Sequence, residues 1–412
     1  MRYLRLMLTI LLVGSAASAR ADSSAGGTAF DFLNFDASAR AVALGGAYTA
    51  LSADSSALIY NPAGLARVRA HEATFMHNQY AQGLTQDFLG FAARQGFGFQ
   101  LNTASLNDIP RTTISQPGGT GSSFGISDLA LGAGYGFDLG EDWSVGAAGK
   151  FIRETIDNVS ATGGAVDAGV LYRASGLPGL TFGSSLLNVG PAIKFMSASQ
   201  QLPTTARLGG AYAFSAWDNR QTAVFDVTKT ITDKVRFGIG YETMLQKSFA
   251  LRGGFTTRND AGIGVTAGVG WSGKNFAADY AIVPMGDVGL THRLSVTVRW
   301  GEVAAPTRTD RRTSLIDDPL LRAYQAAESA RGDKDCESAK NLYREVITLA
   351  QTAGRKDDVV ADAYTGIGLC VLAEGKDALA LRFFKKALGI STKAKMTEVA
   401  RRESKRLSET QP

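Results

Sequence analysis

The sequence is poor in the residues that bind metals. It has only two cysteines and three histidines among its 412 residues, and no Cys-x-x-Cys pair is present. No histidine stands at metal-ligand spacing from another candidate ligand. These absences exclude the common metal-binding patterns, and we predict that the protein has no metal or other cofactor.

Long apolar runs are also missing beyond the first residues. No later segment has the roughly 20 consecutive apolar residues that a membrane helix needs. The mean hydropathy of −0.03 would by itself suggest a soluble protein. Membrane barrels give similar values, however, because their strands alternate apolar and polar residues. The net charge of +5 is small and arises from both signs, so nucleic acid is not a predicted partner.

Signatures of catalysis are weak. The sequence has no phosphate loop, dinucleotide fingerprint or paired carboxylates. Gly121-Ser-Ser-Phe-Gly125 matches the nucleophile elbow in its letters. That motif requires a strand, a turn and a helix, whereas this copy lies in a glycine-rich loop without a nearby histidine. We therefore predict that the protein is not an enzyme.

The first residues have the layout of a secretory signal peptide. Two arginines precede the short apolar run Leu6–Val13, and Ala19-Arg20-Ala21 fits the small-x-small cleavage rule. The alternative is a buried N-terminal helix. We predict that residues 1–21 are removed and that the mature chain begins near Asp22.

The remaining composition divides the chain near residue 301. The part before it is rich in glycine, whereas charged residues are concentrated after it. Such a shift marks a domain boundary. We predict an N-terminal plug or hatch segment at 22–70, an outer-membrane β-barrel at 71–301, a linker at 302–318 and a periplasmic helical domain at 319–412.

Residues 71–300 read as about 14 antiparallel strands separated by turns. In the last of them, Leu294, Val296, Val298 and Trp300 alternate with polar residues. Successive side chains of a strand point to opposite faces, so we expect the apolar face to contact outer-membrane lipid and the polar face to line the lumen. An even strand number places both chain ends on one side, the periplasm. Long loops are predicted at 107–125 and 191–203.

The predicted inner face combines glycines with scattered charges. Gly132, Gly134 and Gly136 lie opposite large apolar residues of one strand. Glycine in a strand marks either the close approach of another backbone, as a plug would make, or strand curvature. Both interpretations stay open. The charged residues predicted to face the lumen are Lys150, Arg236, Glu242, Asp279 and Arg299.

The segment before the first strand consists mostly of small residues. Its candidate plug motif comprises Gly45, Gly46, Asp54, Asn61, Pro62 and Gly64. With Ala39-Arg40, Ala47 and Leu65, these residues resemble the N-terminal region of the PorV/PorQ family, which is similar to FadL-type fatty-acid transporters. The resemblance covers about residues 28–300. It implies a barrel of fourteen strands with the N-terminal segment folded into the lumen as a hatch.

After residue 319 the apolar period becomes helical. Tyr364, Ile367, Gly368 and Val371 precede a turn at Gly375, and Ala380, Phe384 and Ala387 follow it. This spacing matches a tetratricopeptide repeat of 34 residues. A weaker copy spans 320–346, and a basic helix at 397–407 caps the stack. Such stacks often bind protein partners; the alternative is a helical bundle without a partner.

Cys336 and Cys370 fall at the start and end of two helices that we expect to pack antiparallel. A disulfide between them is compatible with the periplasm. The alternative is two buried thiols.

Three functions compete at this point. Resemblance to PorV implies an outer-membrane component of protein secretion or assembly, with the helical domain as its partner-binding module. Resemblance to FadL implies transport of a hydrophobic molecule past a movable hatch, with a hydrophobic ligand in the barrel. The third is a structural tether between the outer membrane and a periplasmic partner.

Overall fold

The computed structural model describes residues 28–301 and 319–409, except 196–197, 218, 353, 355–357, 392–393 and 395. The predicted signal peptide and linker lie outside the described residues. The chain divides into two compact units, Met1–Thr307 and Arg308–Pro412. Among the described helices, none is long and apolar enough to cross a membrane.

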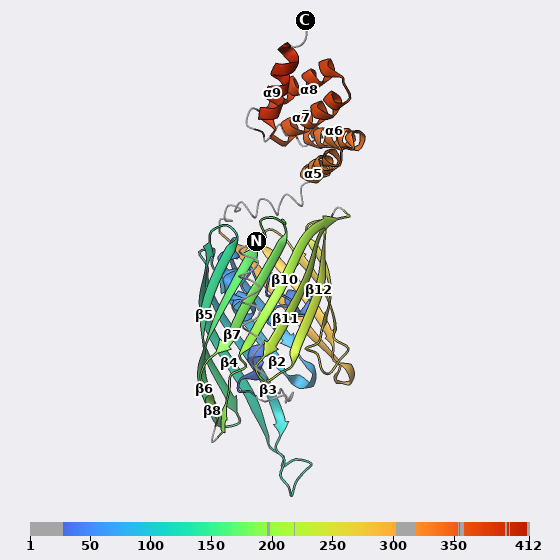
Figure 1. Ribbon diagram of the computed structural model, residues 1–412. Helices are drawn as coiled ribbons and strands as arrows, with labels where there is room; N and C mark the ends of the chain where they lie inside the picture. The colour runs from blue at the N-terminus through green and yellow to red at the C-terminus, as the bar shows by residue number, and fades with distance from the viewer. Residues whose placement is uncertain are drawn as a thin grey trace. The chain divides into compact units, whose positions relative to one another are not determined.

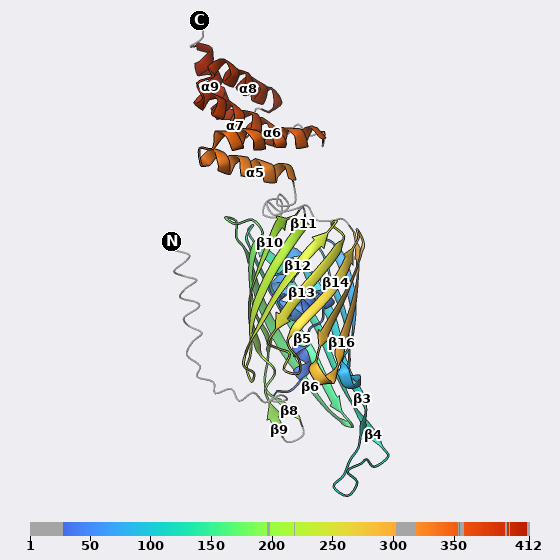
Figure 2. The same cartoon turned by 90° about the vertical axis from the view of Figure 1, so that its right-hand side faces the viewer.

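The first unit is a closed antiparallel barrel of fourteen strands, which confirms the predicted fold class and strand number (Figures 1 and 2). Every strand pairs with its sequence neighbour except where β7 pairs with β10, and β1 closes the barrel against β16. The strands are β1 (His71–Gln79), β2 (Thr85–Ala92), β3 (Phe97–Pro110), β4 (Ser123–Leu139), β5 (Trp143–Ile156), β6 (Val159–Arg173), β7 (Leu180–Val189), β10 (Thr205–Ala216), β11 (Asn219–Thr230), β12 (Val235–Leu245), β13 (Phe249–Thr256), β14 (Val265–Ser272), β15 (Phe276–Pro284) and β16 (Leu290–Trp300).

The alternation predicted for the last strand is present. Leu294 and Trp300 are 50% and 46% exposed, whereas the intervening Ser295 and Thr297 are buried. Phe75, Phe151 and Phe237, on other strands, are exposed in the same way. An apolar exterior around a polar interior is the arrangement that faces lipid.

The two rims of the barrel differ. His71 pairs with Trp300, so the barrel begins and ends at the same rim, here called the His71 rim. Its connections are short: 93–96, 140–142, 174–179, 217–218, 246–248 and 273–275. The opposite rim, here called the long-loop rim, carries 111–122, 190–204 and 257–264.

The two predicted long loops are more ordered than expected. Strands β3 and β4 extend into the first one, which leaves only 111–122 as a connection. The second contains a small hairpin of β8 (Ile193–Phe195) and β9 (Ala198–Gln200). Short 3-10 turns η3 (Ala81–Gly83) and η4 (Gly286–Val288) lie in two other connections of this rim.

Residues 28–70 fill the barrel lumen and are called the hatch below (Figure 1). The hatch contains η1 (Asp31–Asn34), α2 (Ala39–Ala43), α3 (Ala57–Tyr60) and η2 (Pro62–Arg67). Most of its side chains are fully buried, including Tyr48 and Tyr60. Its small residues let these short elements lie directly against the barrel wall.

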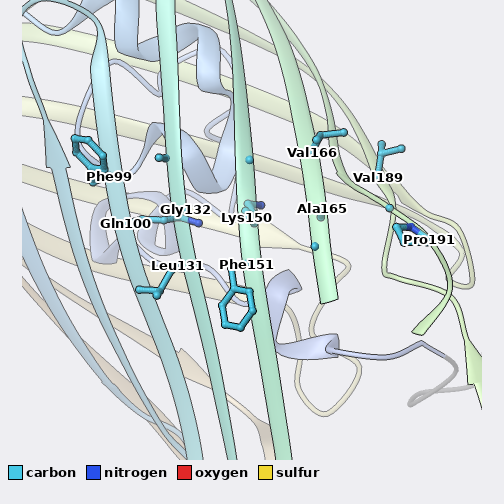
Figure 3. Close-up of a pocket in the computed structure, with 14 residues that line it drawn as sticks. Phe99, Gln100, Leu131, Gly132, Lys150, Phe151, Ala165, Val166, Val189 and Pro191 are labelled. Atoms are coloured by element: carbon cyan, nitrogen blue, oxygen red, sulfur yellow. The ribbon is translucent and has the colours of Figure 1, made fainter. Parts of the chain in front are cut away.

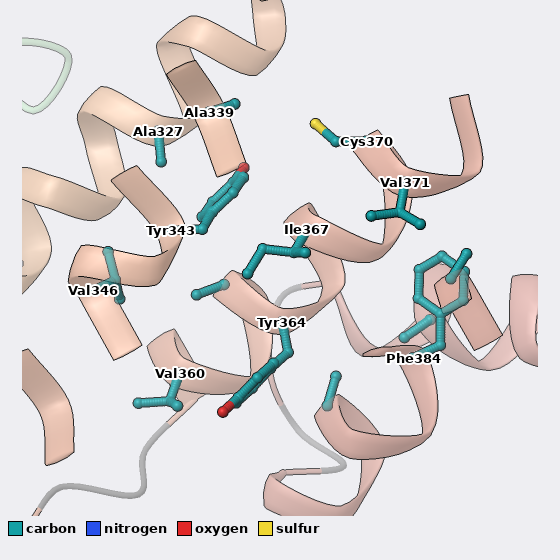
Figure 4. Packing of buried hydrophobic residues seen from close by; sticks show 14 of the residues in the cluster. Ala327, Ala339, Tyr343, Val346, Val360, Tyr364, Ile367, Cys370, Val371 and Phe384 are labelled. Carbon is teal, nitrogen blue, oxygen red and sulfur yellow. The ribbon is translucent and has the colours of Figure 1, made fainter. Parts of the chain in front are cut away.

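The described residues of the second unit contain five helices. They are α5 (Pro319–Gly332), α6 (Cys336–Thr352), α7 (Asp358–Ala373), α8 (Asp377–Ile390) and α9 (Thr397–Glu409). The predicted buried positions form its core, with Tyr343, Ile367 and Phe384 at the centre (Figure 4). The helix-pair turns fall at 333–335 and 374–376, a spacing longer than the 34 residues of a tetratricopeptide repeat. The tetratricopeptide assignment stays a prediction.

Candidate functional site

Two glycines make the tightest turn of the hatch. Gly45 and Gly46 have φ values of 69° and 72°, in the left-handed region that side chains disfavour. A Cβ on Gly45 would also lie 2.5 Å from the carbonyl oxygen of Phe255 in the wall. The turn therefore requires glycine for both its conformation and its contact.

Asn61 and Pro62 begin η2 and bind it to the wall. The Asn61 side chain accepts a hydrogen bond from the Ala63 amide at 3.1 Å, and proline occupies the first turn, as at many helix starts. The Asn61 amide nitrogen donates to the carbonyl oxygen of Val170 in β6 at 3.0 Å. One side chain thus both caps a turn of the hatch and attaches it to the barrel.

Asp54 and Gly64 act within the hatch. The Asp54 carboxylate accepts hydrogen bonds from the Ser56 amide at 2.9 Å and from the Tyr48 hydroxyl. A Cβ on Gly64 would lie 1.7 Å from the carbonyl oxygen of Ser52, so only glycine fits there. All six residues of the candidate plug motif therefore shape the hatch itself.

The inward glycines of the wall lie against the hatch backbone. A Cβ on Gly240 would come within 2.6 Å of the Leu44 carbonyl oxygen, and one on Gly146 within 2.4 Å of that of Pro62. Gly136 contacts the backbone of Ala66 in the same way, whereas Gly134 contacts the side chain of Leu58. Of the two interpretations left open by the sequence, close backbone approach applies at Gly240, Gly146 and Gly136.

Buried ion pairs attach the hatch to β12–β15. Glu242 accepts two hydrogen bonds from the hatch residue Arg40, at 2.9 and 2.7 Å, and one from Arg252 at 2.6 Å. Arg252 also pairs with Asp279 at 2.6 Å. Glu242 and Arg252 are buried, and Arg40 is 32% exposed. Removing one partner of a buried network typically costs about 3–5 kcal/mol, because the remaining charge is left unpaired.

A second buried pair attaches the hatch to β10 and β11. Asp226 accepts hydrogen bonds from the Tyr48 amide, at 3.0 Å, and from the amide and hydroxyl of Thr49, at 3.1 and 2.6 Å. Arg207 pairs with Asp226 at 3.0 Å and donates to the carbonyl oxygen of Gly46 at 2.7 Å. Sequence analysis missed both residues; their inward positions in alternating strands were the available signal.

The first residues of the hatch contact β3–β6 in a different way. Among them, Phe30, Phe32 and Leu33 pack into an apolar cluster. The wall contributes Ala104, Ala130, Ile152, Ala161 and Ala165 to this cluster. Among these residues, the Phe30 amide also donates a hydrogen bond to the Glu154 carboxylate at 3.0 Å. Apolar packing therefore dominates the contact between β3–β6 and residues 28–35, here called the N-terminal segment. On its other side, Asn34 accepts hydrogen bonds from Thr205 and Arg258.

Amide side chains of this half of the wall are incompletely paired. Gln100 is buried, and neither atom of its amide group has a partner among the described residues. One amide atom of Asn102, and one of Asn78 on β1, is likewise buried without a hydrogen-bond partner among the described residues. An unpaired buried polar group costs about 1–3 kcal/mol, so the wall favours its present contacts less here than at β10–β15.

The wall also has a seam behind the N-terminal segment. Pairing of β6 with β7 ends at Val166–Val189, after a register shift, so residues 159–165 of β6 pair only with β5 in the described chain. Apolar side chains cover the gap: Ile193 contacts Gly163, and Leu202 contacts Gly190. Side-chain packing closes the barrel here, where hydrogen bonds close it elsewhere.

On the outside of the wall next to this seam lies an apolar groove of about 1030 Å³ (Figure 3). The small outward residues Ala133, Gly149 and Gly164 form its floor, since a Cβ on Gly149 would have no neighbour within 4 Å. The larger side chains at its edges are Phe99, Leu131, Phe151, Val166, Val189 and Pro191.

A polar cavity of about 410 Å³ lies at the long-loop rim, between the N-terminal segment and β10–β13. Its guanidinium groups already have carboxylate partners: Arg258 pairs with Asp36 at 3.1 Å, and Arg236 pairs with Asp233 and Asp260. Threonine and asparagine side chains supply much of the remaining lining. The cavity is therefore polar, with its charges matched.

All five charges predicted to face the lumen lie on the inner face of their strands. Glu242, Asp279 and Arg236 take part in the ion pairs above. Lys150 pairs with Asp167 at 2.9 Å beside the seam, and Arg299 donates to Glu72 at 3.1 Å. They are structural ion pairs and hydrogen bonds, as barrel interiors commonly contain.

The described residues do not bring reactive side chains together at a catalytic or metal-binding centre. The His, Cys, Asp and Glu residues among them form no group that could hold a metal ion. Ser123, at the nucleophile position of the elbow-like sequence, is the first residue of β4 and pairs with Pro110 of β3, so a strand and not a helix follows it. That environment lacks the parts of a nucleophile elbow.

In the helical unit, Cys336 and Cys370 are free thiols. Burial and the neighbouring Cys336 thiol raise the pKa of Cys370 to about 12. The two sulfurs therefore lie close enough to interact, and the disulfide stays a prediction. Labelling of both thiols in protein isolated under oxidising conditions would contradict it.

Residues 10–156 match the family described as "Uncharacterised protein family (UPF0164)". This match covers less than half of the chain and reaches the end of β5. The PorV/PorQ resemblance is not reproduced by it and stays a prediction. Comparison with curated proteins finds no match.

Several solved barrels are similar in structure. The toluene transporter TbuX of Ralstonia pickettii has 14% identity and a TM-score of 0.49, over 66% of this chain and 100% of that one. The monoaromatic hydrocarbon channel CymD has 10% identity, a TM-score of 0.49 and the same coverages. A Pseudomonas aeruginosa FadL homologue has 13% identity and a TM-score of 0.39, over 63% and 96%. At these values, the similarities carry no inference about what this chain binds.

Proposed function

We propose that the first unit is an outer-membrane channel that releases a small hydrophobic molecule sideways into the membrane through the seam beside β6. The observation that carries this proposal is the coincidence of three features. The apolar cluster of the N-terminal segment lies on the inner side of the barrel wall. The part of β6 that does not pair with β7 belongs to the wall itself, and the apolar groove lies on the outer side of the wall.

The proposed path follows from the contacts. When residues 28–35 leave the apolar cluster, Phe30, Phe32 and Leu33 vacate a space lined by alanines and Ile152. A hydrophobic molecule in that space is separated from the groove by side chains of the 190–203 connection, not by a strand ladder. The rest of the hatch stays attached through Arg40, Thr49 and Asn61.

The orientation is part of the proposal. Long connections of outer-membrane barrels lie outside the cell and short turns lie in the periplasm. The long-loop rim would then be the mouth, and the His71 rim would face the periplasm, with both ends of the barrel sequence on that side.

Filling the groove tests the path. Gly164→Phe adds a large side chain where the nearest non-neighbouring atom is 3.5 Å from the Cβ position, so the barrel can accept it. Gly253→Phe is the matched control, because Gly253 is also outward-facing with no neighbour within 4 Å, on β13. We expect Gly164→Phe to abolish most uptake of radiolabelled octane by cells producing the full chain, and Gly253→Phe to leave it unchanged. Equal uptake by both variants would contradict the proposal.

A second candidate is a secretion or assembly component, as resemblance to PorV implies, with the helical unit as its partner-binding module. The supporting observation is charge. Helices α8 and α9 expose the basic side chains Arg382, Lys385, Lys386, Arg401, Arg402, Lys405 and Arg406. We expect an acidic protein partner.

Cross-linking pull-down with the full chain and with a chain lacking 302–412 tests this second candidate. A partner lost on truncation and released by salt supports it, since screening weakens such contacts. A structural tether would also lose its partner, but deletion of the protein would leave the secreted proteins in the medium unchanged. Recovery of the same partners by both chains would contradict both ideas.

A further inference from the structure

The polar cavity at the long-loop rim and the apolar cluster are neighbours. Leu33 belongs to the apolar cluster and also lines the cavity, and Phe35 packs against the cluster while lining the same cavity. Asp31, Asn34 and Asp36, from the same stretch, turn polar groups into the cavity. One short segment therefore separates a polar site from an apolar one, and a molecule occupying both places would be amphipathic.

The charges of the cavity are already neutralised within the protein. Arg258 is held by Asp36 and by the carbonyl oxygen of Asn34. Arg207 is held by Asp226 at 3.0 Å. A charged group entering this cavity would have to displace a carboxylate or guanidinium from a formed pair, and breaking the buried Arg207–Asp226 pair is strongly unfavourable. The cavity therefore disfavours fatty-acid carboxylates and other ionised groups.

The polar groups of the cavity that are available to bind a ligand are hydroxyl groups. Thr228 and Thr232 line it, and their hydroxyls have no hydrogen-bond partner among the described residues. A hydroxyl can both donate and accept, so these side chains suit a ligand that also carries hydroxyls. A volume of about 410 Å³ falls at the small end of ligand pockets, which range over roughly 300–1,000 Å³.

We propose that the transported molecule is an amphiphile whose uncharged, hydroxyl-bearing head occupies this cavity while its hydrocarbon chain replaces Phe30, Phe32 and Leu33 in the apolar cluster. This inference rests on the proposed function, since it names the substrate class of the same path. It differs from the transport of a pure hydrocarbon or of an ionised fatty acid.

Three radiolabelled probes with hydrocarbon chains of the same length test which head group the cavity accepts. They are monooctanoylglycerol, octanoate and octane. Initial uptake is measured in cells producing the full chain, after subtraction of uptake by cells without it. We expect monooctanoylglycerol uptake to exceed octanoate uptake by about tenfold, the difference that one or two net hydrogen bonds provide.

The double variant Thr228→Val, Thr232→Val removes the two hydroxyls with little change of shape. It should lower monooctanoylglycerol uptake by about tenfold and leave octane uptake unchanged. Thr222→Val is the matched control, because Thr222 is also buried and inward-facing on β11 but lies outside the cavity. It should change neither.

The outcomes separate the two proposals. If octane enters but monooctanoylglycerol is not preferred to octanoate, or if the double variant behaves like the control, the head site is wrong and sideways transport stands. If none of the three probes enters above background, the proposed function fails and the head site fails with it.

Discussion

The two halves of the wall hold the same hatch by different physics. Strands β10–β15 hold it through buried ion pairs, with Asp226 and Glu242 at their centres, and through glycines that touch its backbone. Strands β3–β6 hold its N-terminal segment through apolar packing beside unpaired amides. Ion pairs break only at high cost once buried, whereas an apolar contact can be exchanged for another apolar molecule. The comparison teaches that the contacts with β10–β15 anchor the hatch, whereas those between β3–β6 and the N-terminal segment can open.

The largest expected effect comes from neutralising the anchor. Glu242→Gln leaves Arg40 facing a neutral amide in a buried site, and Arg252 with Asp279 as its remaining charged partner. We expect the free energy of unfolding to fall by about 3–5 kcal/mol, measured by urea unfolding in lipid vesicles. A change below about 1 kcal/mol, as expected for an exposed pair such as Arg111–Asp157, would contradict the distinction.

Adding a methyl group to a glycine of β12 that touches the hatch should have the next largest effect on the free energy of unfolding. Gly240→Ala places a Cβ 2.6 Å from the Leu44 carbonyl oxygen, and such overpacking costs about 1–3 kcal/mol. Gly253→Ala, on the outer face of the neighbouring strand, has no neighbour within 4 Å and serves as the control. Equal stability of the two variants by the same urea unfolding would show that the hatch does not press on the wall there.

The smallest effect is expected on the half that opens. Glu154→Gln retains an oxygen that can accept the hydrogen bond from the Phe30 amide. We expect the free energy of unfolding to change by less than about 0.5 kcal/mol, the usual range for substitutions that break no network. A loss as large as that of Glu242→Gln would mean that both halves anchor the hatch by charge.

Hydrogen exchange compares the two halves without mutation. Backbone amides of residues 28–35 should exchange faster than those of 39–50, because local opening draws on the least stable contacts. Exchange at equal rates, read by mass spectrometry of the full chain, would remove the proposed difference in mobility.

Much of this arrangement could be predicted from the sequence. Alternation in segments such as Leu294–Trp300 predicted the membrane-facing strands, because a strand exposes every second residue to lipid. The inward glycines indicated either a backbone packed against the wall or strand curvature, and the resemblance of the small-residue motif implied the former. Both are local signals, readable within a few residues.

The features that decide function were not readable in this way. The seam depends on a register shift between β6 and β7, which changes no local alternation pattern. The partners Arg40 and Glu242 are far apart in sequence, so their pairing appears only once the barrel closes. In the helical unit, the packed positions were predicted correctly, because their helical spacing is a local signal, while the tetratricopeptide assignment stays a prediction.

Locking the N-terminal segment tests the central claim most directly. The Ala29 amide donates to the Gln201 carbonyl oxygen at 2.9 Å, so Ala29→Cys with Gln201→Cys places two thiols at neighbouring backbone positions. Mass spectrometry verifies the crosslink, and Ala29→Cys alone, oxidised in the same way, is the control. We predict that the oxidised double variant takes up no octane above background and that a reductant restores uptake. Normal uptake with the crosslink formed would show that the segment does not move.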